Sequence, residues 1–251
     1  MTPSRPRYDA VYLSPHLDDA VFSAGLDMHA RVAAGERVAL VTVFTASVPD
    51  PAGFALACQT DKGLPPEADY MSIRRAEDHA AAARLGLEPE QVFHLPLPEA
   101  PHRGYTDAAD LFGGVHADDA GTPDRVAEAL RLFADAGRWM LPLGLGHHVD
   151  HLQVIEAVRR TAAPPPCEAW FDTPYHLKPD VTAPPPDRKV KPNPAAVAAK
   201  LDACAAYSTQ LPFQFGGERA MRQTLAGVAE AWIRLDPVGP GGCGPPTPHR
   251  R

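Results

Sequence analysis

Cysteine is scarce in this chain of 251 residues, which has only Cys58, Cys167, Cys204 and Cys243. No two of them have the C-x-x-C spacing that is typical of structural zinc and redox sites. Disulfides persist in oxidising compartments and are rare in the cytoplasm. The scattered positions therefore favour free thiols and predict a cytoplasmic protein.

Long apolar runs and clusters of positive charge are also missing. No stretch approaches the roughly 18 consecutive apolar residues of a membrane-spanning helix, and the first residues lack the apolar run of a signal peptide. The chain has 24 Lys and Arg against 31 Asp and Glu, a net charge of −7. An acidic chain without a basic run is a poor binder of nucleic acid. We therefore expect neither a membrane nor a nucleic-acid partner.

Proline is the residue type in excess, and its 29 occurrences are concentrated in residues 164–194 and 237–248. The usual share of proline is about 5%, so these segments are expected to be loops. The rest of the chain is strongly patterned, and a chain of this mass buries about 70% of its surface on folding. We predict a single domain over residues 1–236, followed by a Pro/Gly-rich tail over residues 237–251.

Short apolar runs that are typical of strands alternate with segments whose apolar residues recur every three or four positions. Strands are expected at 10–14, 37–45, 92–95, 139–143 and 168–171, and helices at 19–34, 71–85, 124–136, 150–162, 194–207 and 217–233. This alternation predicts an α/β fold, a Rossmann-like three-layer sandwich with a mostly parallel central sheet. Ligands of such sheets bind beyond the carboxyl ends of the strands.

Two of these strand ends are dense in metal-ligating residue types. The first is Ser-Pro-His-Leu-Asp-Asp at 14–19, and the second is Gly-Leu-Gly-His-His-Val-Asp-His at 144–151. Imidazole and carboxylate groups suit zinc or another divalent transition metal. A catalytic zinc typically takes three protein ligands and keeps one position open for water. Two histidines and one carboxylate meet that need.

The spacing within each cluster suggests a division of labour. His148 and His151 are three residues apart at the start of a helix, as are His16 and Asp19, so each pair can share a helix face. Asp18 points away from Asp19. A carboxylate that is not a ligand can act as a general base on water that a metal has made more acidic.

Simpler interpretations exist for each residue alone. Asp18 and Asp19 are also good helix N-caps, His16 can be an ordinary histidine at a strand end, and a single H-x-x-H is a weak signal. The metal site rests on the combination of two clusters at two strand ends. The role of His147 stays open, because three histidines in five residues exceed what one metal requires.

The strand–Ser-Pro-His16-Leu-Asp18-Asp19–helix motif, with the late Gly-His-x-Asp-His motif, resembles the LmbE/PIG-L family of zinc-dependent de-N-acetylases. The resemblance spans residues 8–235 and also includes three weaker segments. They are Arg74-Arg75-x-Glu77, Asp172-Thr-Pro-Tyr175, and Lys200 with Tyr207-Ser-Thr-Gln210. The proline that often follows the first histidine of the family is Leu17 here, and no tyrosine shortly precedes the second motif.

The resemblance implies an LmbE-like fold and a role for each motif residue. The implied zinc ligands are His16, Asp19 and His151, and the implied catalytic residues are Asp18 as general base, His148 facing the substrate carbonyl, and Asp150 orienting His148. One Zn²⁺ per chain is expected, although Fe²⁺ accepts the same donor set. Whether Asp18 or His148 protonates the leaving amine is left open.

The family resemblance implies a small-molecule substrate, an N-acetylglucosamine conjugate. Arg74 and Tyr175 are the predicted substrate-binding residues. Arg75, Arg103 and Asp50 are further candidates for the mouth of the site, although Arg74 and Arg75 also fit a solvated helix face. Two other functions remain open: a metal-dependent phosphoesterase, which often uses two metals about 3.5–4 Å apart, and a non-catalytic sugar-binding member of the family. The aglycone is left open, and so is the choice between a monomer and a homo-oligomer.

Overall fold

A seven-stranded sheet forms the centre of the computed structural model, which describes residues 7–235. Its strand order is β3-β2-β1-β4-β5-β7-β6. The strands are β1 Ala10–Ser14, β2 Val38–Thr42, β3 Val92–His94, β4 Trp139–Pro142, β5 Cys167–Trp170, β6 Arg188–Val190 and β7 Glu230–Leu235. Strands β1 to β5 are parallel, and β7 pairs antiparallel with both β5 and β6.

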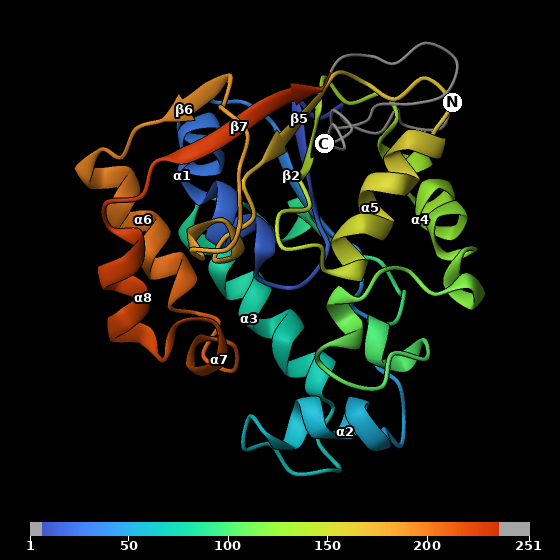
Figure 1. The fold of residues 1–251 in the computed structure, drawn as a ribbon. Coiled ribbons are helices and arrows are strands. Elements are labelled where there is room, and N and C mark those ends of the chain that lie inside the picture. The colour runs from blue at the N-terminus through green and yellow to red at the C-terminus, as the bar shows by residue number, and fades with distance from the viewer. Residues whose placement is uncertain (1–6, 236–251) are drawn as a thin grey trace.

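Helices cover both faces of this sheet, with α4 and α5 on the right of Figure 1 and α1, α6 and α8 on the left. The helices are α1 Asp19–Ala33, α2 Gly53–Thr60, α3 Tyr70–Arg84, α4 Thr122–Leu130, α5 Val149–Arg160, α6 Pro194–Cys204, α7 Leu211–Phe215 and α8 Glu218–Leu225. The predicted three-layer α/β sandwich with a mostly parallel sheet is confirmed. Among residues 7–235, no helix is long and apolar enough to cross a bilayer.

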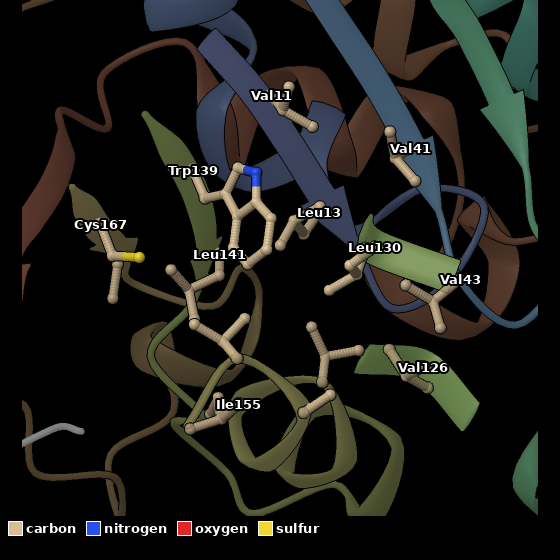
Figure 2. Close-up of a cluster of buried hydrophobic side chains, with 14 of the residues drawn as sticks. Val11, Leu13, Val41, Val43, Val126, Leu130, Trp139, Leu141, Ile155 and Cys167 are labelled. Atoms are coloured by element: carbon tan, nitrogen blue, oxygen red, sulfur yellow. The ribbon is translucent and has the colours of Figure 1, made fainter. Parts of the chain in front are cut away.

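Alternate residues of the central strands fill two hydrophobic cores. On the α4/α5 face, Val11 and Leu13 of β1 pack with Trp139 and Leu141 of β4 and with Ile155 of α5, as Figure 2 shows. The opposite face uses the intervening residues, Tyr12, Leu40 and Met140, against α1, α3 and α6. Both faces of a parallel sheet are buried in this way, which explains why the central strands are continuously apolar.

The C-terminal third differs from the prediction in two places. The helix expected at 217–233 ends at Leu225, and Glu230–Leu235 forms β7, because its aromatic and β-branched residues Trp232 and Ile233 pair with β5. A short edge strand, β6, also lies within the proline-rich segment expected to be loop. The predicted tail at 237–251 lies outside the described residues.

Candidate metal centre and active site

The two predicted clusters meet because their strands are neighbours. β1 pairs with β4, with Val11 opposite Trp139, so the loops that follow both strands leave the sheet side by side. The contact between His16 Nε2 and Asp150 Oδ2, at 2.8 Å, joins residues 134 positions apart. The convergence that the strand-end rule predicts is therefore present in the structure.

Each loop is shaped by its own short-range contacts. After β1, the Ser14 hydroxyl donates to the His16 carbonyl at 2.6 Å, and the His16 backbone N–H donates to Asp19 Oδ2 at 2.9 Å. After β4, Gly146 has a φ of +89°, and a Cβ there would lie 2.8 Å from the ring of Tyr175. Only glycine fits both that conformation and that contact.

Three imidazoles face one another at this junction. His16, His148 and His151 each offer a nitrogen, and these nitrogens lie within 4.8 Å of one another. The His16 and His148 ring centroids are 4.8 Å apart, and those of His16 and His151 are 5.5 Å apart. His148 and His151 are buried, and His16 is nearly so.

Carboxylates fix which nitrogen of two of these rings is available. His151 Nδ1 lies 2.7 Å from Asp172 Oδ1, and His16 Nε2 lies 2.8 Å from Asp150 Oδ2. Each of these nitrogens is thereby assigned the ring proton, which it donates to the carboxylate. The lone pairs of His16 Nδ1 and His151 Nε2 are left to face the same atom, Asp19 Oδ2, at 3.0 and 3.1 Å.

These atoms fit a divalent cation. His151 Nε2 is buried without a hydrogen bond, and two bare nitrogens beside a carboxylate oxygen need a positive charge among them. Carboxylate–histidine–metal arrangements are usual at zinc sites. Ligands about 2.0–2.1 Å from a tetrahedral zinc lie about 3.3 Å from each other, close to the spacing here. His16, Asp19 and His151 are therefore suited to hold zinc.

The pKa values of the same groups also indicate a site for a cation. Burial lowers the pKa of His151, but the Asp19 carboxylate and the bond to Asp172 outweigh burial and raise it to about 9. Burial likewise opposes the charged form of Asp19, and yet the two histidines hold its pKa well below the usual range. The surroundings of His151 and Asp19 therefore strongly stabilise a positive charge between them.

His148 is held differently from the other two histidines. It is the N-cap of α5, and its Nδ1 accepts the Asp150 backbone N–H at 3.2 Å. That bond assigns the ring proton to Nε2. Burial, reinforced by the nearby His16, lowers the pKa of His148 to about 3, so the ring is neutral. His148 is thus equipped as an N–H donor rather than as a metal ligand.

Asp150, predicted to orient His148, contacts that ring through its backbone N–H and directs its carboxylate elsewhere. That carboxylate accepts from His16 Nε2, from Arg103 Nη2 at 2.6 Å and from the Ala100 backbone N–H. Only the backbone amide of Asp150 contacts His148. The fully buried carboxylate needs these donors to stabilise its charge, and the orienting role of Asp150 stays a prediction.

Asp18 is a buried carboxylate that lines the cavity and is not engaged by a hydrogen bond from any residue in 7–235. The helix-cap interpretation is wrong, since Asp18 occupies the N-cap position of α1 but makes no side-chain cap bond. Arg74 Nη2 lies 3.9 Å away. Burial, followed by the charge of Asp19, raises the pKa of Asp18 to about 7.

A cavity of about 360 Å³ opens in front of these groups. Arg74 and Tyr175, predicted as substrate-binding residues, both line it, together with His16, Asp18 and His148. Arg74 is buried and paired with Glu99, so the solvated-face interpretation is wrong for this residue.

Three other residues predicted for the mouth lie elsewhere. The Arg103 side chain is 5% exposed, pairs with Asp150, and bonds Asp119 through Nε and Nη2, both at 3.0 Å. Asp50 lines a separate cavity. Arg75 donates to the Thr45 carbonyl. His147, whose role was open, is exposed and faces a different, largely apolar cavity.

Sequence reasoning missed several residues of the cavity and its support. Glu99, Lys62, Phe112 and Phe213 line the cavity but belong to segments without a motif, Phe213 to the short helix α7. Asp172 belongs to the Asp172-Thr-Pro-Tyr175 segment, but its contact with His151 was not predicted. Its position just after β5, at a strand end, was a signal that could have found it. The other weak segments form scaffolding: Glu77 accepts hydrogen bonds from Ser208 and Thr209, and Lys200 pairs with Glu230 at 2.7 Å.

Comparisons with known proteins agree with this geometry. Residues 11–162 match the model of the PIG-L family, described as GlcNAc-PI de-N-acetylase. A 2'-N-acetylparomamine deacetylase of Streptomyces fradiae is 34% identical over 168 residues, which are 65% of this chain and 56% of that protein. The match therefore spans little more than half of that relative.

Solved structures share the fold. The zinc-inhibited form of teicoplanin deacetylase superimposes with a TM-score of 0.72 at 24% identity, covering 90% of this chain and 98% of that one. A 4-carboxy-2-hydroxymuconate hydratase of Pseudomonas putida superimposes with a TM-score of 0.54 at 20% identity, covering 91% and 96%. The fold therefore serves more than one reaction, and the reaction must be argued from the site.

Proposed function

The chain belongs to the PIG-L family of de-N-acetylases, and from this premise we propose that it is a metal-dependent N-deacetylase. It would remove the acetyl group from an N-acetylated amino sugar by hydrolysis of the linear amide. We propose Zn²⁺ as the cofactor, one per chain, held by His16, Asp19 and His151. When bound, zinc supplies a Lewis acid that polarises an amide carbonyl and makes water more acidic.

One observation carries the proposal: an unbonded, buried carboxylate stands beside a site built for a cation. Asp18 follows His16 by two residues, lines the cavity, and receives no hydrogen bond from residues 7–235. A carboxylate needed only for structure would be capped or paired closely. Asp18 is instead held next to the reacting position, with Arg74 at 3.9 Å, as a general base must be.

The residues of the chain divide the hydrolysis between them. Asp18 accepts a proton from the attacking water, and the base strength of its carboxylate is increased by burial. The neutral His148 donates its Nε2–H to the oxygen that becomes negative as the tetrahedral intermediate forms. The ring keeps this orientation because its Nδ1 accepts a hydrogen bond from the Asp150 backbone N–H.

Departure of the amine requires a proton on the amide nitrogen. The protonated Asp18 carries one after the first step, and it faces the same cavity as His148. We propose that Asp18 returns this proton, because His148 is needed as a donor to the oxyanion at the same moment. Tyr175 and Arg74 are the proposed substrate-binding residues beside it.

The wider setting is also a proposal. We propose that one deacetylase domain spans residues 1–236, that the substrate is an N-acetylglucosaminyl conjugate, and that the reaction takes place in the cytoplasm. The free thiols Cys58 and Cys204 support a reducing compartment.

The test is a panel of N-acetylglucosamine conjugates, with release of free amine measured for the zinc-loaded protein and for Asp18→Ala. The wild type is expected to release amine, and the variant is expected to keep its metal and lose about 10²- to 10⁴-fold in kcat. Full activity of Asp18→Ala would remove the proposed base. Hydrolysis of phosphate esters with two metals bound per chain would replace the deacetylase with a phosphoesterase.

A further inference from the structure

Two lysines that the proposed reaction does not use lie at the cavity in front of Asp18. Lys62 follows α2, and Lys178 follows the turn at Tyr175–Leu177. Lys62 is half-buried and Lys178 is exposed. They come from different parts of the chain and line one cavity, so their charges act on the same ligand.

Most other charged groups of the cavity lie beside a group of opposite charge. Arg74 pairs with Glu99 and lies near Asp18, and Asp150 is bonded to His16 and Arg103. Neither lysine forms an ion pair with a carboxylate in residues 7–235. The two ammonium groups are therefore the cations of the cavity wall that have no carboxylate partner among the described residues.

Aromatic rings hold both ammonium groups in place without neutralising them. Lys62 Nζ lies 4.9 Å from the ring centroid of Phe213 and 5.2 Å from that of Tyr70, and donates to the Cys58 carbonyl at 2.6 Å. Lys178 Nζ lies 5.0 Å from the ring centroid of Tyr175. A lysine ammonium has three donors, and a cation–π contact leaves them available for an anion.

We propose that the substrate is an N-acetylglucosamine conjugate whose second part carries a carboxylate or a phosphate, which Lys62 and Lys178 bind. This inference rests on the proposed deacetylase function and adds the charge of the substrate to it. The aromatic rings beside the lysines offer apolar faces to the sugar. A conjugate that carries ammonium groups, such as an aminoglycoside, would meet two like charges at the same place.

The test compares four N-acetylglucosaminides that differ only in the group at the end of a two-carbon aglycone. The aglycones are hydroxyethyl, carboxymethyl, phosphoethyl and aminoethyl, and acetate release gives kcat/KM for each. The two anionic substrates are expected to exceed hydroxyethyl by about tenfold, as two charge-assisted hydrogen bonds would give, and aminoethyl is expected to be poorest. The advantage should shrink at high salt. The carboxymethyl and phosphoethyl arms separate the two anion sources.

The lysines are tested by Lys62→Gln and Lys178→Gln, with the exposed Lys191→Gln as the matched control. Each cavity variant is expected to lower the ratio of kcat/KM for the anionic substrates to that for hydroxyethyl by about fivefold. Lys191→Gln should keep the wild-type ratio. Equal kcat/KM on all four substrates, or an unchanged ratio in both cavity variants, would overturn the inference.

A binding measurement separates this inference from the proposed function. Calorimetry with Asp18→Asn compares the affinities of the carboxymethyl and hydroxyethyl glycosides, without and with Lys62→Gln in addition. A preference for carboxymethyl that the lysine change removes supports anion recognition even if no substrate releases acetate, in which case only the deacetylase proposal fails. No preference, or one independent of Lys62, overturns the inference itself.

Discussion

At the scale of single residues, the site depends on which ring nitrogen each histidine leaves free. The carboxylates of Asp150 and Asp172 bind one nitrogen of His16 and of His151, and the other nitrogen of each ring turns to Asp19. His148 is anchored by a backbone N–H instead. Three histidines that look equivalent in the sequence thus acquire two different roles.

These roles predict opposite effects for two alanine substitutions. His151→Ala removes a proposed ligand and is expected to lower the metal content of the purified protein sharply. His148→Ala should keep the metal and lose about 10²-fold or more in kcat, since an oxyanion donor is worth that much. Metal analysis and amine release on the same samples give both quantities. The reverse pattern would mean that the two roles are exchanged.

Asp172 provides a second prediction, because it acts on the metal only through His151. In Asp172→Asn the amide cannot stabilise His151 as a carboxylate does, and metal affinity is expected to fall about 10- to 100-fold. Competition with a chromogenic chelator measures this affinity directly. The exposed Asp180→Asn is the matched control, and equal affinities for the two variants would show that Asp172 has no such role.

Much of the residue pattern was predictable. His16, Asp18, Asp19 and His151 follow strand ends at spacings that indicate a metal and a base, and the structure brings them together. The destination of the Asp150 carboxylate was not predictable, because its partner Arg103 comes from a loop 47 residues away. Contacts of this kind leave no local signal in the sequence.

At the scale of elements, the loop between β4 and α5 controls the shape of the cavity. Gly146 has a φ of +89° and lies against Tyr175, whereas Gly35, at the end of α1, has a φ of +82° and open space where a Cβ would be. Alanine at either position would be in a strained backbone conformation, but only at Gly146 would its methyl group also clash with Tyr175.

Comparing Gly35→Ala with Gly146→Ala separates the effect of backbone strain from the effect of displacing the Tyr175 ring. Gly35→Ala is expected to cost about 1 kcal/mol in the free energy of unfolding and to leave kcat/KM unchanged. Gly146→Ala should cost more and should also lower kcat/KM, since the new methyl group pushes the Tyr175 ring. Urea unfolding and amine release check both. Equal kcat/KM for the two variants would show that Tyr175 does not need this packing.

Helix α1 is tied to the sheet by a buried carboxylate far from the metal site. Asp27 accepts from Tyr12 at 2.6 Å, from Arg31 at 2.9 Å and from Arg188 at 2.7 Å. Burial alone would raise the pKa of Asp27, but Arg31 and Arg188 outweigh burial and lower it. Such a group stabilises the fold above its unfolded pKa of about 3.9 and loses this contribution as the pH falls through the folded value.

Asp27→Asn is therefore expected to be less stable than the wild type at pH 7, by about 2 kcal/mol, because Arg31 and Arg188 each lose one of two carboxylate partners and keep Glu36 and Glu168. The difference should shrink as the pH is lowered below the unfolded pKa of about 3.9 and toward the lower folded pKa of the wild-type carboxylate. Urea unfolding across this range, with the exposed Asp135→Asn as control, measures the effect. A difference that stays constant with pH would contradict the assignment.

At the scale of the whole molecule, the parallel part of the sheet was predictable and the antiparallel edge was not. β1 to β5 alternate with helices and carry continuous apolar runs, which are local signals. β6 and β7 were missed, because neither is fixed by a local pattern: β7, which follows a helix-like segment, pairs with β5, and the three-residue edge strand β6 pairs with β7. Tertiary pairing overrode the local pattern there.

The cavity wall is likewise fixed by tertiary contacts rather than by local sequence patterns. Tyr207 reaches Asp78 across 129 residues and Gln210 reaches Tyr70 across 140, so the segment that carries α7 is placed by partners far away in the sequence. The floor of the site comes from two strand ends and was predictable. Its rim combines residues of α3 and α7 with loop residues, and their meeting required the structure.

The central claim is that two loops, joined by the pairing of β1 with β4, bind one cation while Asp18 stays unbound. Anomalous diffraction at the zinc absorption edge, from crystals of zinc-loaded protein, tests it most directly. The account predicts one anomalous peak per chain, within bonding distance of His16 Nδ1, Asp19 Oδ2 and His151 Nε2. Two peaks, or a single peak coordinated by Asp18, would contradict it.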